Sequence, residues 1–333
     1  MPLASRLLPL LLGSLLALGG PHGAHAQRRG LGGLAEEFGD SGTCADRART
    51  FSRLMNRPRT AFIFGPAPDR EDIAYGNAPR ERLDVFLSKR RDPAAPAPVI
   101  VMVHGGGWCV GDKALSGVTK NKVDHWVPLG FVFVSVNYPM LPDGSAALQQ
   151  AAAVARAVAY VQKHAGEWGG DGKRVVLMGH SAGAHLVSLV NADARLRAQY
   201  DVKPVLGTVS LDSGATDVVE QLRKSMPRMH GRFEEAFGAT EDGWIKSSPF
   251  HQLDATASPW LGVCSTARAD DPCSQARAYA DKSLKLGIKA TVVPLDKPHG
   301  AINKDLGSPG AYTNAVDEFL ASLDPGIRTL LAR

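Results

Sequence analysis

The feature that most constrains this fold is a series of short, continuous apolar runs separated by helical patterns. Six such runs, rich in β-branched residues and nearly free of charge, lie downstream of residue 98: VIVMV (99–103), FVFVSV (131–136), RVVLM (174–178), VLGTVSL (205–211), WLGVCS (260–265) and ATVVPL (290–295). A strand that is apolar on both faces has to be covered on both faces. These runs therefore predict an α/β fold with a mostly parallel central sheet and helices on each side.

Other segments flank or interrupt this alternation. The clearest helix lies within 146–168, where apolar residues recur at steps of three and four. Residues 217–250 contain two short helical patterns with methionine and aromatic side chains, and we expect a small cap insertion there. Residues 27–80 are rich in Arg, Gly and Pro and are expected to form an N-terminal arm on a main domain at 81–325, which begins with the strand RLDVFL (82–87).

Residues 1–26 have the layout of a secretory signal peptide, with an early arginine, a leucine-rich stretch at 7–18 and the ending Ala24-His25-Ala26. The apolar stretch is about a dozen residues long, short of the roughly 20 that span a bilayer. We expect export to the periplasm or the cell exterior, with cleavage near Ala26 and no membrane span in the mature chain.

The four cysteines of an exported chain predict disulfides. Cys264 and Cys273 are close in sequence and are expected to pair, which leaves Cys44 with Cys109 as the second pair. A metal site is the competing interpretation, but no CxxC or paired His/Cys spacing supports it.

Composition excludes some partners. The chain has 333 residues, 44% of them hydrophobic, which is enough to bury one large core. Its net charge of +5 is scattered among acidic residues, with no basic stripe interleaved with aromatic residues, so nucleic acid is not an expected partner. The sequence does not indicate an oligomeric state.

Ser181 is the expected nucleophile. It lies in the GxSxG pattern of LMGHSAGAH (177–185), between a predicted strand and a helical stretch. A serine on such a sharp turn needs small neighbours because the backbone is strained and closely packed. The N-terminus of the following helix favours developing negative charge.

An oxyanion hole is expected upstream, where HGGG (104–107) directly follows the strand at 99–103. Glycines let backbone N–H groups turn toward a substrate oxygen without obstruction by a Cβ atom. The predicted donors are the N–H groups of Gly105, Gly106 and Ala182.

His299 is the expected general base, which a serine nucleophile requires because its hydroxyl is weakly nucleophilic on its own. It lies in LDKPHGAIN, on a loop that follows the last strand. The other histidines beyond the signal segment abut the glycine motifs or lie in helical and cap segments. The chain order Ser, acid, His also fits a hydrolase triad.

Several aspartates compete for the third position, where a carboxylate orients the imidazole. Asp270 is preferred and Asp271 is the first alternative, because both follow the strand WLGVCS on the loop that the Cys264–Cys273 disulfide would clamp. Asp212, which follows VLGTVS, is the principal rival from another strand.

These motifs resemble the α/β-hydrolase superfamily, specifically the carboxylesterases related to hormone-sensitive lipase and the feruloyl-esterase-like and arylformamidase-like enzymes. The likeness covers about residues 74–323, including HGGGWCVGDK, VNY, GHSAGAH, SPF and PHGAIN. The hormone-sensitive-lipase group usually has an acidic residue before its serine, whereas His180 here indicates the other two groups. The cysteine-bracketed stretch also replaces the usual acid-loop pattern. The resemblance implies that Trp108 and Tyr138 shape the substrate pocket.

The sequence therefore predicts an exported serine hydrolase that cleaves carboxylic esters by a Ser-His-Asp triad. Its substrate would be a small-molecule or polymer-attached ester, and the reaction needs no cofactor or metal. Two alternatives stay open: an amidase or arylformamidase-like hydrolase, and a non-catalytic binding protein on a hydrolase scaffold.

Overall fold

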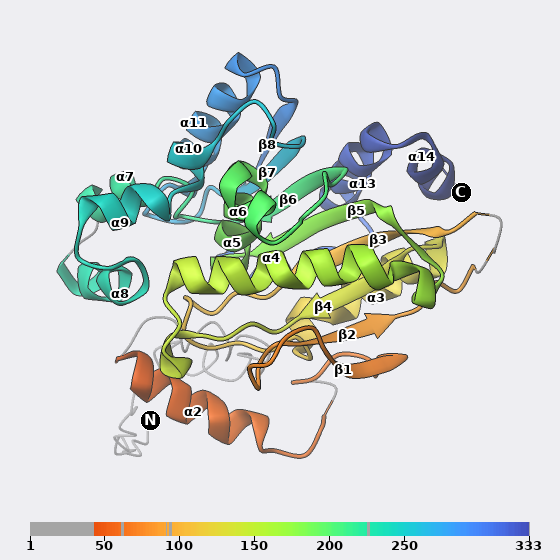
Figure 1. Ribbon diagram of the computed structural model, residues 1–333, viewed down its shortest axis with the longest axis horizontal. Coiled ribbons are helices and arrows are strands. Elements are labelled where there is room, and N and C mark those ends of the chain that lie inside the picture. The colour runs from red at the N-terminus through yellow and green to blue at the C-terminus, as the bar shows by residue number, and fades with distance from the viewer. Residues whose placement is uncertain (1–42, 61–62, 91, 93–94, 225–226, 333) are drawn as a thin grey trace, which may run out of the picture. The chain divides into compact units, whose positions relative to one another are not determined.

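The structure is a computed structural model that describes residues 43–60, 63–90, 92, 95–224 and 227–332. The predicted signal peptide and its cleavage site lie outside the described residues. Within them, an eight-stranded sheet has the order β1-β2-β4-β3-β5-β6-β7-β8 (Figure 1). The strands are β1 (Arg70–Ala74), β2 (Arg82–Phe86), β3 (Ala97–Val103), β4 (Val132–Val136), β5 (Gly170–His180), β6 (Gly207–Leu211), β7 (Trp260–Ser265) and β8 (Ala290–Leu295).

The sheet is mostly parallel, as predicted. β2 pairs antiparallel with β1 and β4, and every pairing from β4 through β8 is parallel. The six apolar runs of the sequence correspond to β3 to β8, although β5 begins four residues earlier than its apolar run. Because parallel strands end at the same edge, the residues after β3, β5, β6, β7 and β8 come together there.

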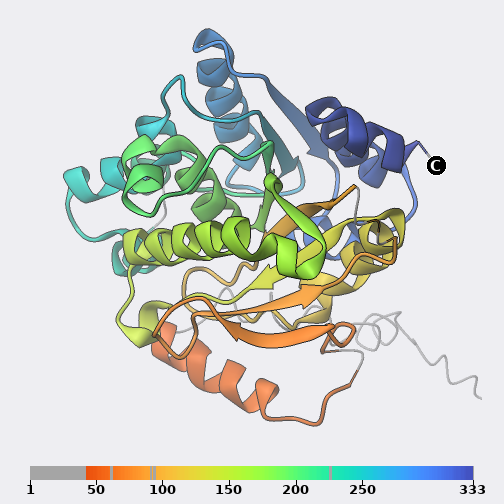
Figure 2. The same ribbon diagram turned by 45° about the vertical axis from the view of Figure 1, so that its right-hand side comes forward.

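Helices cover both faces of the sheet (Figure 2). Alternate β3 residues divide between two cores: Val99 and Val101 pack with residues of α4 and α5, whereas Ile100 and Met102 pack with residues of α3, α12 and α13. The period of two in a strand produces this division, because successive side chains point to opposite faces. The helices on these faces are α3 (Ser116–Leu129), α4 (Ala147–His164), α5 (Ala182–Ala192), α6 (Ala194–Gln199), α11 (Pro272–Lys285), α12 (His299–Asp305), α13 (Ala311–Leu323) and α14 (Pro325–Leu331).

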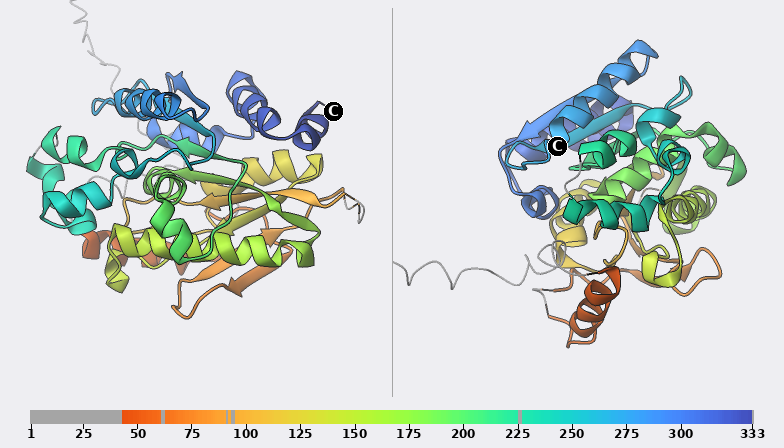
Figure 3. Two further views of the ribbon diagram at one scale, coloured as in Figure 1. Left: turned by 45° about the horizontal axis from the view of Figure 1, so that its top comes forward. Right: turned by 90° about the vertical axis from the view of Figure 1, so that its left-hand side faces the viewer.

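The segment between β6 and β7 is helical. It contains α7 (Val218–Lys224), α8 (Pro227–Phe237), α9 (Glu241–Lys246) and α10 (Pro249–Gln252). Figure 3 shows α7, α8 and α9 grouped together beyond one end of the sheet. This position lies over the edge where the strands of the parallel part end.

The N-terminal segment contributes two elements that the sequence analysis did not identify. Helix α2 (Cys44–Met55) begins with a capping box in which the Thr43 hydroxyl accepts from the Asp46 N–H and the Asp46 carboxylate accepts from the Thr43 N–H. Strand β1 pairs with β2 at the edge of the sheet. Both expected disulfides are present, Cys44–Cys109 and Cys264–Cys273.

No helix within the described ranges is long and apolar enough to cross a bilayer.

Candidate active site

Ser181 occupies a sharp turn between β5 and α5. Its φ and ψ are 55° and −118°, outside the regions that ordinary residues favour. Small neighbours are required, because a Cβ atom at Gly179 would lie 2.3 Å from the Gly183 carbonyl oxygen and one at Gly183 would lie 2.1 Å from the Val103 carbonyl oxygen. The Ser181 N–H donates to the carbonyl of Leu211, the last residue of β6, at 2.9 Å. The strands therefore fix the backbone of the serine.

The glycine-rich loop after β3 lies against this serine. A Cβ atom at Gly105 would lie 2.9 Å from the Ser181 Cβ, and one at Gly106, where φ is 119°, would lie 1.6 Å from the Val110 carbonyl oxygen. In the part of the chain that the structure describes, no protein group accepts a hydrogen bond from the N–H groups of Gly105, Gly106 or Ala182. Backbone N–H groups without a protein acceptor can stabilise a negative oxygen.

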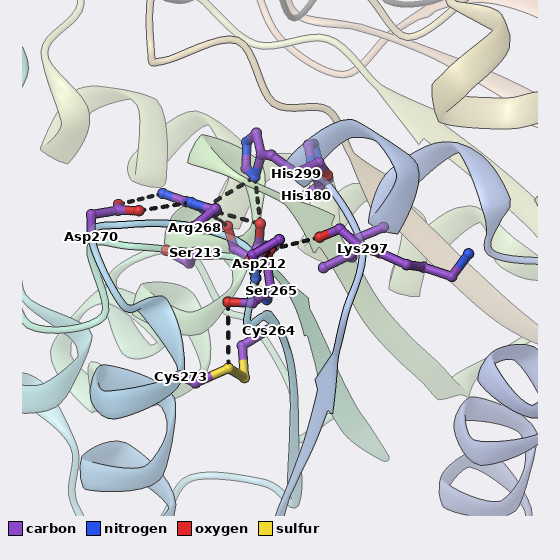
Figure 4. A network of polar contacts seen from close by, with 12 residues as sticks. His180, Asp212, Ser213, Cys264, Ser265, Arg268, Asp270, Cys273, Lys297 and His299 are labelled. Atoms are coloured by element: carbon purple, nitrogen blue, oxygen red, sulfur yellow. Dashed lines mark hydrogen bonds and ion pairs between the residues drawn. A yellow bond between two sulfur atoms is a disulfide. The ribbon is translucent and has the colours of Figure 1, made fainter.

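His299 begins helix α12 and pairs with Asp212. Its Nδ1 lies 2.6 Å from the Asp212 Oδ2 (Figure 4). A carboxylate at this distance requires a proton on Nδ1, which leaves the Nε2 lone pair available as a base. The ring of His299 also packs against the ring of His180, with 4.5 Å between the ring centroids.

Asp212 directly follows β6 and its side chain is fully buried. Its Oδ1 accepts from the Ser265 N–H at 2.8 Å. Burial alone would raise the pKa of this carboxyl, but the His299 hydrogen bond and the charge of Arg268 lower it to about 2. Asp212 is therefore ionised at neutral pH, as a carboxylate that orients a histidine must be.

The two aspartates favoured from the sequence do not reach His299. The Asp270 carboxylate accepts two hydrogen bonds from Arg268, at 2.9 Å from Nε and 2.5 Å from one terminal nitrogen. Asp271 instead caps helix α11, where its carboxylate accepts from the Ser274 N–H. Asp212, the principal rival, contacts the His299 ring, whereas the preferred Asp270 contacts Arg268.

The neighbouring strand explains this difference. β6 pairs with both β5 and β7, so the residue after β6 lies between the serine turn and the loop that follows β7. The sequence analysis preferred an acid after β7, kept Asp212 as a rival, and did not consider Arg268. The missed signal was Arg268, a basic residue close to two candidate acids, Asp212 after β6 and Asp270 after β7.

Trp108 links the glycine-rich loop to the segment between β6 and β7. Its indole N–H donates to His185 Nδ1 at 3.2 Å, and His185 Nε2 donates to the Ser247 carbonyl at 2.7 Å. Phe233 and Phe237 pack on the indole with ring centroids 6.1 and 4.8 Å away. Burial lowers the pKa of His185 to about 4, so the ring stays neutral and both of its nitrogens have partners. Sequence reasoning did not assign a role to His185.

Tyr138 lies beneath the glycine-rich loop. Its side chain is fully buried, its hydroxyl donates to the His104 carbonyl at 2.9 Å, and its ring stacks on the His104 ring with centroids 4.7 Å apart. The expected role of Tyr138 in the substrate pocket stays a prediction, and the contacts described here are all with His104 of the loop.

Among the described residues, no group of three or more His, Cys, Asp or Glu side chains could hold a metal ion.

Comparison with known proteins places this geometry in a family context. The BD-FAE family model matches residues 83–260, which include Ser181 and Asp212 but end before Arg268 and His299. The chain is 27% identical over 314 residues to LipM, a probable carboxylic ester hydrolase of Mycobacterium tuberculosis, covering 85% of this chain and 71% of that protein. It is 30% identical over 228 residues to the kynurenine formamidase of Danio rerio, covering 66% of this chain and 70% of that protein.

Other relatives match over a shorter part of their length. The probable isoprenylcysteine α-carbonyl methylesterase ICMEL1 of Arabidopsis thaliana is 34% identical over 127 residues, which cover 38% of this chain and 25% of that protein. Among solved structures, the thermophilic esterase Est2 of Thermogutta terrifontis has a TM-score of 0.64 at 23% identity, covering 77% of this chain and 92% of that one. This similarity confirms the predicted α/β-hydrolase fold. The BD-FAE family model matches more than half of this chain, so the chain belongs to the BD-FAE family.

Proposed function

We propose that this protein is a serine hydrolase that cleaves carboxylic esters, with Ser181, His299 and Asp212 as its triad. The observation that carries the proposal is the 2.6 Å contact between His299 Nδ1 and Asp212 Oδ2 at the sheet edge that also bears the Ser181 turn. Relatives that are named carboxylic ester hydrolase and esterase support ester cleavage as the activity.

In the first half of the reaction, Ser181 Oγ attacks the acyl carbon and its proton passes to His299 Nε2. The Asp212 carboxylate stabilises the imidazolium that forms. The N–H groups of Gly105, Gly106 and Ala182 bind the carbonyl oxygen as it becomes negative. When the intermediate collapses, the leaving alcohol takes the proton from Nε2, and water then cleaves the acyl-serine by the same steps.

One contact of this mechanism has still to form. Across the described residues, the Ser181 hydroxyl makes no hydrogen bond to the His299 ring. Catalytic hydrogen bonds of ligand-free enzymes are often long and tighten when substrate binds. We expect the Ser181–His299 hydrogen bond to form in the substrate complex.

The proposal includes the cap and the compartment. Helices α7–α10 lie between β6 and β7, and Phe233 and Phe237 contact Trp108 beside the glycine-rich loop, so we assign this segment the role of a cap on the acyl site. Two disulfides favour an oxidising compartment, which agrees with the signal peptide predicted at residues 1–26.

The test is covalent labelling of the oxidised protein with a fluorophosphonate probe, with peptide mass spectrometry to map the adduct. We expect labelling at Ser181, no labelling of Ser181→Ala, and a loss of roughly 10⁶-fold in kcat for p-nitrophenyl ester hydrolysis by that variant. Full hydrolytic activity of folded Ser181→Ala would refute the assignment.

A second candidate activity is formamide cleavage, which the relationship to a kynurenine formamidase favours. The same triad would act on an N-formyl group, with protonation of an amine leaving group by His299. Comparing a formanilide with the formate ester of the matching phenol separates the two activities. A formamidase should turn over the amide at a kcat/KM within about tenfold of that for the ester. An ester hydrolase should leave the anilide essentially untouched.

A further inference from the structure

Arg268 is placed to act on the proposed triad although it does not belong to it. One terminal nitrogen of its guanidinium lies 3.0 Å from the Asp212 Oδ2, 3.1 Å from the Asp212 carbonyl oxygen and 3.1 Å from His299 Nδ1 (Figure 4). The rest of the guanidinium is held by the two hydrogen bonds to Asp270. Only 22% of the Arg268 side chain is exposed, so water screens its charge weakly.

We propose that Arg268 and Asp270 form a positioning pair that sets the charge experienced by His299. The inference rests on the proposed triad and adds two residues that would not touch the substrate. Arg268 orients the Asp212 carboxylate, and Asp270 compensates the positive charge that Arg268 brings beside the histidine.

The contact between Arg268 and His299 has a defined sign. Because Asp212 accepts the proton of His299 Nδ1, that nitrogen cannot also accept from the guanidinium, and the 3.1 Å approach joins two donors. A positive charge on the imidazole is disfavoured by the guanidinium cation at this distance. Arg268 therefore disfavours the imidazolium form of His299, which Asp212 favours.

Asp270 limits this effect. Two parallel hydrogen bonds between a guanidinium and a carboxylate are the strong, geometrically fixed form of an ion pair. With Asp270 in place, the pair is neutral as a whole, so Asp212 retains its attraction for the imidazolium that forms during the reaction. Without Asp270, the Arg268 charge would be directed at Asp212 and His299 alone.

Other groups also influence His299, and none of them changes between the variants below. The ring of His180 packs on it, and burial, followed by the charge of His299, holds the pKa of His180 well below its ordinary value. Among the described residues, further charged or titratable groups of the elements packed here are Lys122 of α3, Lys297 of the loop after β8, Asp305 of α12 and Tyr312 of α13.

The experiment measures log(kcat/KM) against pH for p-nitrophenyl ester hydrolysis by four folded proteins: wild type, Arg268→Gln, Asp270→Asn and the double variant. Arg268→Gln should move the midpoint of the acidic limb about 1 unit to higher pH, because protonation of His299 becomes easier. Asp270→Asn should move it to lower pH, because the Arg268 charge is no longer compensated. The double variant restores the balance of charge and should return the midpoint toward that of the wild type.

Opposite shifts that cancel in the double variant would support the pair, because a purely structural role lowers activity at all pH values and leaves the limb in place. An unmoved limb in both single variants would overturn the inference. If Arg268→Gln fails to fold, the downward shift predicted for Asp270→Asn decides alone. Asp212→Asn, measured alongside, tests the proposed triad separately. Full activity of Asp212→Asn would refute the triad. An inactive Asp212→Asn, together with an unmoved acidic limb in the Arg268 and Asp270 variants, would refute only the role of the pair.

Discussion

Two residues of the proposed triad have positive φ values, 55° at Ser181 and 57° at Asp212. Such conformations cost roughly 1–3 kcal/mol each and persist only where the surroundings determine them. Here the surroundings are hydrogen bonds to neighbouring strands: Ser181 N–H to the Leu211 carbonyl and Asp212 N–H to the Val263 carbonyl, at 2.9 and 2.7 Å. The serine and the carboxylate are therefore held in place before any substrate arrives.

Asp212→Asn should lower kcat by about 10⁴-fold with little change in structure, because an amide at this position favours the wrong tautomer of His299. Asp271→Asn is the matched control, since an asparagine can still cap α11 and the side chain is away from His299. Steady-state ester hydrolysis at pH 8 compares the two. Equal losses of kcat in Asp271→Asn and Asp212→Asn would contradict the assignment of Asp212 as the acid of the triad.

For single residues, the sequence predicted the positions that depend on the backbone. It did not identify which aspartate contacts His299, because that depends on how far the side chains reach. The glycines around Ser181 and His299 after the last strand follow from local pattern. The choice among Asp270, Asp271 and Asp212 does not, because all three follow neighbouring strands. Arg268, which takes the Asp270 carboxylate, decides between them only once distances are known.

Among the elements, helix α2 is joined to the site by a covalent bond outside the backbone. The disulfide from its first residue, Cys44, ends at Cys109, three residues after Gly106. The loop that carries the proposed oxyanion donors is thus covalently joined to an N-terminal helix 65 residues away in sequence. A second disulfide closes the loop that carries Arg268.

Replacing Cys44 and Cys109 together by serine should lower the free energy of unfolding by about 4 kcal/mol, as the chain-entropy model gives for a loop of this length. The matched variant without Cys264 and Cys273, whose separation is 9 residues, should lose only about 3 kcal/mol. Urea denaturation followed by tryptophan fluorescence measures both. A larger loss from the short loop than from the long one would contradict the entropic account.

The strands were predictable because a short run that is apolar on both faces is typical of a strand buried in a parallel sheet. Helix α2 was not, since the arginine-rich composition around it suggested an irregular arm and its capping box, Thr43 to Asp46, is a short signal. Strand β1 is mostly exposed and has little apolar content, so its pairing with β2 depends on the sheet that it joins.

For the whole molecule, the titration of buried histidines should set the response to acid. Burial lowers the pKa values of both His104 and His185 to about 4, against an ordinary value of 6.5. Both are neutral in the folded protein and take up a proton in the unfolded chain below pH 6.5. Their contribution is therefore fully present above that pH and is lost as the pH falls toward 4.

Between pH 7 and pH 5 we expect each of these two histidines to reduce the free energy of unfolding by about 2 kcal/mol. Urea denaturation at the two pH values measures their sum together with the contribution of His180, whose pKa burial also lowers. His185→Gln should lose less stability than the wild type over the same interval, by about 2 kcal/mol. Asp212 does not contribute in this window, because its carboxyl titrates between about 2 in the folded state and the ordinary 3.8 in the unfolded chain. An equal pH dependence in His185→Gln and wild type would contradict the assignment.

The hydrogen bond between the Ser181 N–H and the last carbonyl of β6 has a consequence for how such an enzyme can diverge. In the proposed triad, Ser181 and Asp212 are both tied to adjacent strands, so the loop after β7 would not have to carry the acid. Its disulfide keeps the two ends of that loop together whatever lies between them. Lineages, or a laboratory library restricted to residues 266–271, can therefore explore new pH optima there without rebuilding the catalytic centre.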